Sequence, residues 1–118
     1  MNTTDLLHRV AEVIDPESAR GTNAVIQYQL TEPVHHVFED GKVSSVTGTH
    51  AAPDVTVVIS DANIRRLLNG ELKLGPAVFT GKLRVKGDLL LAQKLLGLVL
   101  NLLTLRVPMI GTSNVYLV

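Results

Sequence analysis

The sequence contains no cysteine, and only 3% of its residues are aromatic. Without cysteine there are no disulfides, no thiolate nucleophiles and no cysteine-based zinc sites. With so few aromatic rings there are few side chains on which nucleic-acid bases could stack. The 11 basic residues balance 11 acidic ones, so no net charge attracts nucleic acid or acidic lipid. We therefore expect no nucleic-acid partner.

Long hydrophobic runs are also missing. Charged residues such as Asp5 and Glu12 interrupt the N-terminal stretch, which therefore lacks the apolar segment of a secretory signal. The longest apolar run, 95–105, is well short of the roughly 20 residues that a membrane-spanning helix needs. From these two absences we expect a cytoplasmic protein.

What is present is enough apolar material for one domain spanning residues 1–118, with a hydrophobic fraction of 46% and a mean hydropathy of +0.26. The pattern divides it into an N-terminal helix (1–15), strands (22–60), helices with a fifth strand (61–106) and an apolar tail (107–118).

Alternation of apolar and polar residues predicts half-buried strands at 24–30, 55–59 and 82–86. Asp40-Gly41 tolerates the positive φ angles of a two-residue type I′ turn and predicts a hairpin around it. The sequence thus predicts five strands. Because antiparallel strands are followed by helices, we expect an α+β fold with a five-stranded, mostly antiparallel sheet covered on one face by helices.

The predicted helices have recognisable ends. Thr3 or Thr4 can cap the first helix, which stops at Asp15-Pro16 before a loop over 17–22. Ser60 or Asp61 can cap the helix that follows the fourth strand.

The last helix has more apolar surface than contact with one face of the sheet can cover. Its polar residues form one narrow stripe, whereas a helix lying on a sheet needs an apolar stripe only somewhat wider than about 100°. Three partners can cover the surplus: the tail 107–118, a second copy of the chain forming a homodimer, or a bound apolar lipid. If a bound lipid covers the surplus, we expect a hydrophobic tunnel under the last helix to hold it.

Three stretches resemble the sterol carrier protein type 2 lipid-binding domain: PDVTVVISD (53–61), LLNGEL (67–72) and above all GKLRVKGDLLLAQKL (81–95). The resemblance implies an α+β domain with a five-stranded sheet and a tunnel for fatty acyl chains, sterols or isoprenoids. It also implies that Phe79, Leu89, Gln93 and Leu96 lie near the cavity.

We expect further ligand-binding residues on the apolar stripes of the helices. The candidate ligand-binding set is therefore Ile64, Leu68, Phe79, Leu89, Gln93, Leu96 and Leu100.

Candidate catalytic or metal-binding residues are sparse. His35 and His36 are adjacent on a strand, so their side chains point to opposite faces and cannot bind one metal, and we interpret both as surface residues. His8 and His50 have no partner at ligand spacing. We predict no metal site, no cofactor and no catalytic residue.

The function that these patterns favour is non-enzymatic binding or carriage of an apolar ligand. The alternative is an accessory module that dimerises or docks an enzyme acting on lipophilic intermediates such as isoprenoid quinones. A cofactor-free enzyme using the tunnel is a third reading and would need a buried polar group with a shifted pKa. The basic face formed by Lys82, Arg84 and Lys86 could add weak contact with an anionic membrane surface.

Overall fold

The computed structural model describes the chain from residue 1 to residue 106, with the side chains of residues 1 to 100. The elements in chain order are α1 (Thr3–Val13), α2 (Pro16–Ala19), β1 (Asn23–Gln29), β2 (Val34–Glu39), β3 (Lys42–Thr47), β4 (Val55–Ile59), α3 (Asp61–Leu68), α4 (Leu74–Phe79), β5 (Leu83–Gly87) and α5 (Leu89–Arg106). The predicted tail 107–118 lies outside the described residues.

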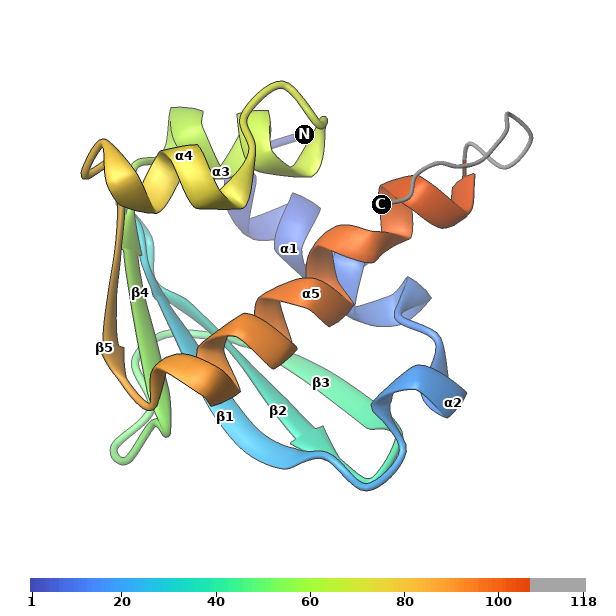
Figure 1. Ribbon diagram of the computed structural model, residues 1–118. Helices are drawn as coiled ribbons and strands as arrows, with labels where there is room; N and C mark the ends of the chain where they lie inside the picture. The colour runs from blue at the N-terminus through green and yellow to red at the C-terminus, as the bar shows by residue number, and fades with distance from the viewer. Residues whose placement is uncertain (107–118) are drawn as a thin grey trace.

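The five strands form one sheet in the order β3-β2-β1-β4-β5. Only the β1/β4 pair is parallel, whereas the β1/β2, β2/β3 and β4/β5 pairs are antiparallel. The helices gather on one side of the curved sheet, with α5 crossing it from the end of β5 toward α1 (Figure 1). The predicted α+β class and the mostly antiparallel sheet are confirmed.

The core lies between that face of the sheet and the helices. Alternate residues of the strands point into it, as the sequence pattern predicts. The fully or nearly fully buried strand residues on this face are Ala24, Ile26, Tyr28, Val34, His36, Phe38, Val55, Val57, Ile59 and Leu83. Helix α1 packs on β3 and β2, whereas α5 packs on β4 and β5.

The turn between β2 and β3 has the predicted geometry. Asp40 and Gly41 have φ angles of 44° and 96°, and Glu39 pairs with Lys42 across the turn. Positive φ at both central positions matches the right-handed twist of the flanking strands. This hairpin therefore fixes the register of β2 against β3.

The beginning of the chain differs from the prediction in two places. The cap of α1 is Asn2, whose side chain accepts a hydrogen bond from the Asp5 N–H, rather than Thr3 or Thr4. Residues 17–22 were predicted as a loop, but they include most of the short helix α2. The reason is that Asp15 caps α2 and Pro16 occupies its first turn, where a missing N–H is tolerated.

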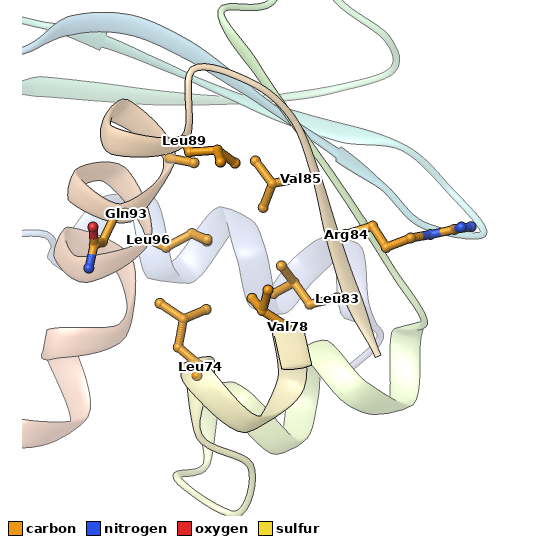
Figure 2. A pocket seen from close by; sticks show the side chains of 10 residues that line it. Leu74, Val78, Leu83, Arg84, Val85, Leu89, Gln93 and Leu96 are labelled. Carbon is orange, nitrogen blue, oxygen red and sulfur yellow. The ribbon is translucent and has the colours of Figure 1, made fainter. Parts of the chain in front are cut away.

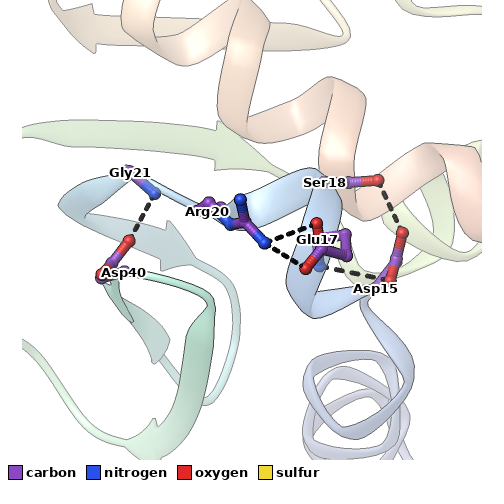
Figure 3. Close-up of polar contacts among 6 residues, drawn as sticks. All are labelled: Asp15, Glu17, Ser18, Arg20, Gly21 and Asp40. Atoms are coloured by element: carbon purple, nitrogen blue, oxygen red, sulfur yellow. Dashed lines mark hydrogen bonds and ion pairs between the residues drawn. The ribbon is translucent and has the colours of Figure 1, made fainter.

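Polar contacts hold α2 and the residues that follow it in place (Figure 3). The Asp15 carboxylate accepts hydrogen bonds from the Glu17 N–H at 3.3 Å and from the Ser18 hydroxyl at 3.0 Å. Arg20 forms an ion pair with Glu17, and the Gly21 N–H donates to the Asp40 carboxylate at 2.6 Å. The last contact ties the start of β1 to the β2–β3 turn.

A buried polar chain joins the sheet to α1. The Tyr28 hydroxyl lies 3.0 Å from His36 Nδ1, and His36 Nε2 lies 3.1 Å from the Leu7 carbonyl oxygen. Because a carbonyl can only accept, Nε2 carries the proton and Nδ1 accepts from the Tyr28 hydroxyl. Burial raises the pKa of Tyr28 and lowers that of His36 to about 4. His36 is therefore a neutral core residue at pH 7.

The interpretation of His35 and His36 as surface residues is wrong, because both are buried. The two side chains do point to opposite faces. His35 Nδ1 lies 2.9 Å from the Gly48 carbonyl oxygen, in the loop that follows β3. The same loop covers Gln27, whose amide accepts from the His50 N–H at 2.7 Å. This loop shelters residues that strand alternation alone would leave in water.

Part of the apolar surface of helix α5 remains exposed to solvent. Ala92, Leu95, Leu96 and Val99 are buried, but Leu89 and Leu90 remain 68% and 79% exposed. Within residues 1–100, whose side chains the structure describes, no helix has both the length and the apolar character needed to cross a membrane. The first turn of α5 therefore presents leucines to solvent at the surface of the domain.

The junction between β5 and α5 depends on one glycine. Gly87 has a φ of 105°, and a Cβ built on it would lie 2.5 Å from the Asp54 carbonyl oxygen. Asp88 follows and caps α5, because its carboxylate accepts from the N–H groups of Leu90 and Leu91. Only glycine fits where the chain turns this close to β4.

We expect stability to fall in mild acid because of His36. Its folded-state pKa of about 4 lies below the ordinary value of 6.5, so the unfolded state binds more protons between these values. The contribution of His36 to the free energy of unfolding should then be fully present above pH 6.5 and should decrease as the pH falls toward 4. From pH 7 to pH 5 the decrease should be about 2 kcal/mol larger in the wild type than in His36→Gln. Urea unfolding at both pH values measures it, and equal decreases in the two proteins would contradict the assignment.

Two glycines near β5 should respond differently to substitution by alanine. Gly87→Ala should lower the free energy of unfolding by about 2 kcal/mol or more, because of the positive φ and the close Asp54 carbonyl. Gly75→Ala in α4 meets open space, and because Pro76 follows and offsets the gain in helix propensity, it should change stability by less than about 1 kcal/mol. Thermal or urea unfolding measures both, and similar shifts would rule out the steric account of Gly87.

Candidate functional site

A pocket of about 570 Å³ lies between α4, β5 and the first half of α5. Figure 2 shows the leucine and valine side chains of these three elements turned toward one another. The lining residues are Leu74, Gly75, Val78, Leu83, Arg84, Val85, Leu89, Ala92, Gln93 and Leu96. The volume falls within the range of about 300–1,000 Å³ typical of small-molecule sites.

Each lining position follows from the periodicity of its element. On β5, Leu83 and Val85 alternate with the basic residues and so face the helices. On α4, Leu74 and Val78 are four residues apart and share one side. On α5 the lining residues recur at helical spacing, and they are Leu89, Ala92, Gln93 and Leu96.

The pocket is deep on one side and open on the other. Leu83, Ala92 and Leu96 are nearly fully buried and form its floor. Val78 and Leu89 are 50% and 68% exposed and form its rim. The predicted tunnel corresponds in this structure to a partly open pocket, and a continuous tunnel remains a prediction.

The walls of the pocket are mostly hydrocarbon. Gln93 is an exposed lining residue with an uncharged amide, whereas the Arg84 side chain extends away from the cavity (Figure 2). None of the ten lining residues has a carboxylate, imidazole, thiol or hydroxyl group. These walls can exclude water from an apolar chain and offer a hydrogen bond at one end, but they supply no general acid, base or nucleophile.

The seven candidate ligand-binding residues do not all lie at this pocket. Leu89, Gln93 and Leu96 line it. Ile64 and Leu68 are buried in the main core, and Leu100 packs against that core half-buried. Phe79 is 91% exposed and is not among the lining residues.

Sequence reasoning missed part of the lining. Leu74, Gly75 and Val78 come from α4, which the sequence predicts only as a short turn of helix after Gly75-Pro76. Leu83 and Val85 were recognised as the inward face of a strand, and their alternation was the available signal for the cavity wall. Ala92 had no signal beyond its place in the apolar arc of α5.

Within the described residues, no group of three or more His, Asp or Glu side chains is placed to hold a metal ion. The ring nitrogens of His8 lie 2.5 Å from the Ser45 hydroxyl and 3.2 Å from the Thr47 hydroxyl, which fixes α1 to β3. The buried Tyr28 and His36 belong to the core and do not line the pocket.

Solved structures share this architecture. The stereoselective inverting sec-alkylsulfatase Pisa1 from Pseudomonas sp. matches 76% of the chain with a TM-score of 0.67 and 19% identity, but the chain spans only 14% of that protein. The palmitated SCP2L2 of Aedes aegypti is 29% identical, with a TM-score of 0.66 over 84% of this chain and 95% of that one. A UbiJ-SCP2 ubiquinone synthesis protein is 17% identical, with a TM-score of 0.63 over 89% and 93%.

The sequence itself matches one family profile, which covers residues 4–99 and therefore most of the chain. The match includes α1, the whole sheet, α4 and the pocket-lining part of α5. It confirms the resemblance carried by the Gly81-to-Leu95 stretch. By this match the chain belongs to the SCP-2 sterol transfer family, a family of lipid-binding and lipid-transfer domains.

Proposed function

We propose that this domain binds the hydrocarbon chain of a lipid, foremost a fatty acyl chain, in the pocket between α4, β5 and α5, and carries it without chemical change. The observation that carries the proposal is the apolar wall of the pocket, built by side chains from all three elements. Membership of a lipid-transfer family supports it, as does the similarity to a protein whose structure is described as palmitated.

The polar groups at the pocket fit a carrier. An acyl chain would lie against Leu83, Val85 and Leu96, where no buried polar group would lose its hydrogen bonds. Its head group would reach the rim, where the Gln93 amide can donate a hydrogen bond or accept one. Because the amide is uncharged, it favours no single head group, and loose selectivity among acyl, sterol and isoprenoid ligands is the expected result.

The alternative function, dimerisation or docking of an enzyme through the last helix and tail, depends on side chains beyond residue 100, which lie outside the described part of the chain. The similarity to the ubiquinone synthesis protein is one of fold, at 17% identity. The pocket is the better supported basis for a function.

A pair of neighbouring leucines tests the proposal. Leu89→Asp should weaken binding of a fluorescent fatty acid by about tenfold or more, because it places a carboxylate on the apolar rim and beside the ligand's own charge. Leu90→Asp, one residue along and not lining the pocket, should change the affinity by less than about twofold. Fluorescence titration in vesicle-free buffer gives both dissociation constants.

The two variants are matched in their effect on the helix. Both place an acid in the first turn of α5, where it interacts favourably with the helix dipole, so their thermal unfolding should agree. Mass spectrometry of solvent extracts from the purified wild type should reveal co-purified lipid. Absence of saturable binding to the wild type, or equal loss in the two variants, would reject the proposed pocket.

A further inference from the structure

The exposed apolar side chains of this domain concentrate beside the pocket. Phe79 is 91% exposed at the end of α4, and Leu90 is 79% exposed in the first turn of α5. Each directly follows a rim residue of the pocket, Val78 and Leu89 respectively. The two side chains therefore flank the pocket at the two ends of β5 and expose a phenyl ring and an isobutyl group to water, which is unfavourable.

The same stretch of chain carries an unbalanced charge. Residues 73–94 contain five of the eleven basic residues and one of the eleven acidic residues, so this segment has a net charge of +4 and the remainder −4. The five basic residues are exposed, and they are Lys73, Lys82, Arg84, Lys86 and Lys94. A zero net charge for the whole chain thus conceals a cationic segment that includes the pocket-lining parts of α4, β5 and α5.

These cations are not neutralised by neighbours. Among the described side chains the one ion pair within 4 Å joins Glu17 to Arg20, far from this segment in sequence. Asp88, the single acid of residues 73–94, is engaged in capping α5. Residues 107–118 contain no Asp or Glu side chain.

The arrangement on β5 argues against a second copy as the partner. β5 is an edge strand, and Lys82, Arg84 and Lys86 all project from the face opposite Leu83 and Val85. Pairing two such strands antiparallel would set cation against cation, which is destabilising. The surface instead matches an anionic partner that also accepts apolar side chains.

From these observations we infer that the Phe79–Leu90 rim and the surrounding basic residues form a docking surface for an anionic lipid bilayer. Phe79 and Leu90 insert below the head groups, while Lys82 and Lys86 contact anionic head groups from the two ends of β5. The pocket lies between the inserted side chains, so a hydrocarbon chain can pass between bilayer and pocket without crossing water. Only this last step rests on the proposed function, since docking itself needs no ligand in the pocket.

Co-sedimentation with phosphatidylcholine vesicles, with and without phosphatidylglycerol, tests the inference. The wild type should bind the anionic vesicles more tightly, and added salt should weaken that binding. Phe79→Gln/Leu90→Gln and Lys82→Gln/Lys86→Gln should each lose about tenfold or more. A matched control, Lys42→Gln/Val46→Gln, removes one exposed cation and one exposed apolar side chain from the opposite edge strand β3 and should bind as the wild type does.

A single tryptophan reports on the rim directly, because the chain has none. The emission of Phe79→Trp should be that of an exposed indole in buffer and should shift to shorter wavelength when anionic vesicles are added. An emission already shifted in buffer and unchanged by vesicles would mean that another part of the chain or a second copy covers Phe79, and would overturn the inference.

Two further outcomes would also overturn it: equal binding of neutral and anionic vesicles, or undiminished binding by Phe79→Gln/Leu90→Gln. The latter would leave a purely cationic contact, as expected for an acidic protein. Fatty acid titration in vesicle-free buffer separates the two proposals, because Phe79→Gln/Leu90→Gln should bind the fatty acid as the wild type does. A wild type that binds vesicles but no fatty acid would reject the proposed function and leave the docking surface standing.

Discussion

Strand β5 keeps two helices apart that would otherwise close on each other. It has five residues and so separates the end of α4 from the start of α5 by about 17 Å. Both junctions are tight: the Lys82 N–H bonds to the Ala77 carbonyl at 2.9 Å, and Gly87 turns against the Asp54 carbonyl. The helices therefore cannot slide together along the strand, and the space between them is filled only at its base. The pocket is a consequence of this spacing.

The other half of the sheet is closed by a different means. There α1 lies directly on β2 and β3, and the chain from Tyr28 through His36 to the Leu7 carbonyl satisfies the polar groups buried beneath it. A buried hydrogen-bonded chain holds its members in one arrangement, because an unpaired member would retain the full desolvation penalty. The domain thus combines a rigid half with an open half. Adaptation to a ligand is expected in the open half, where Val78 and Leu89 are partly in water.

The sequence predicted the features that depend on local patterns. The Asp40-Gly41 turn and the alternation of β5 were both recognisable, because they are set by backbone conformation and by period-two burial. The motif between Gly81 and Leu95 identified the family. Of the four residues that the resemblance puts near a cavity, Leu89, Gln93 and Leu96 line the pocket in this structure, and their contact with a ligand stays a prediction.

What it failed to predict depends on contacts between distant segments. The acceptors that make burial of His35 and His36 tolerable are the Gly48 and Leu7 carbonyls, which lie 13 and 29 residues away. Ile64, expected among the ligand-binding residues, is fully buried in the core, and Phe79, which the resemblance puts near a cavity, is 91% exposed, so their ligand contacts remain predictions. An apolar stripe shows that a residue avoids water in general. Which void it lines, or whether it is covered at all, is decided by the packing of α4 against β5.

The openness of the pocket limits what it can do unaided. Burying a chain of about 16 methylenes completely would contribute on the order of 13 kcal/mol, and association takes back about 4 to 15 kcal/mol. A ligand here would have part of its chain beside Val78 and Leu89, both at least half exposed, so it would gain less than the full amount. Its affinity would then rest on the deep wall formed by Leu83, Ala92 and Leu96. A pocket that gains less than the full amount would bind a ligand more weakly and release it more readily, as the proposed carrier function requires.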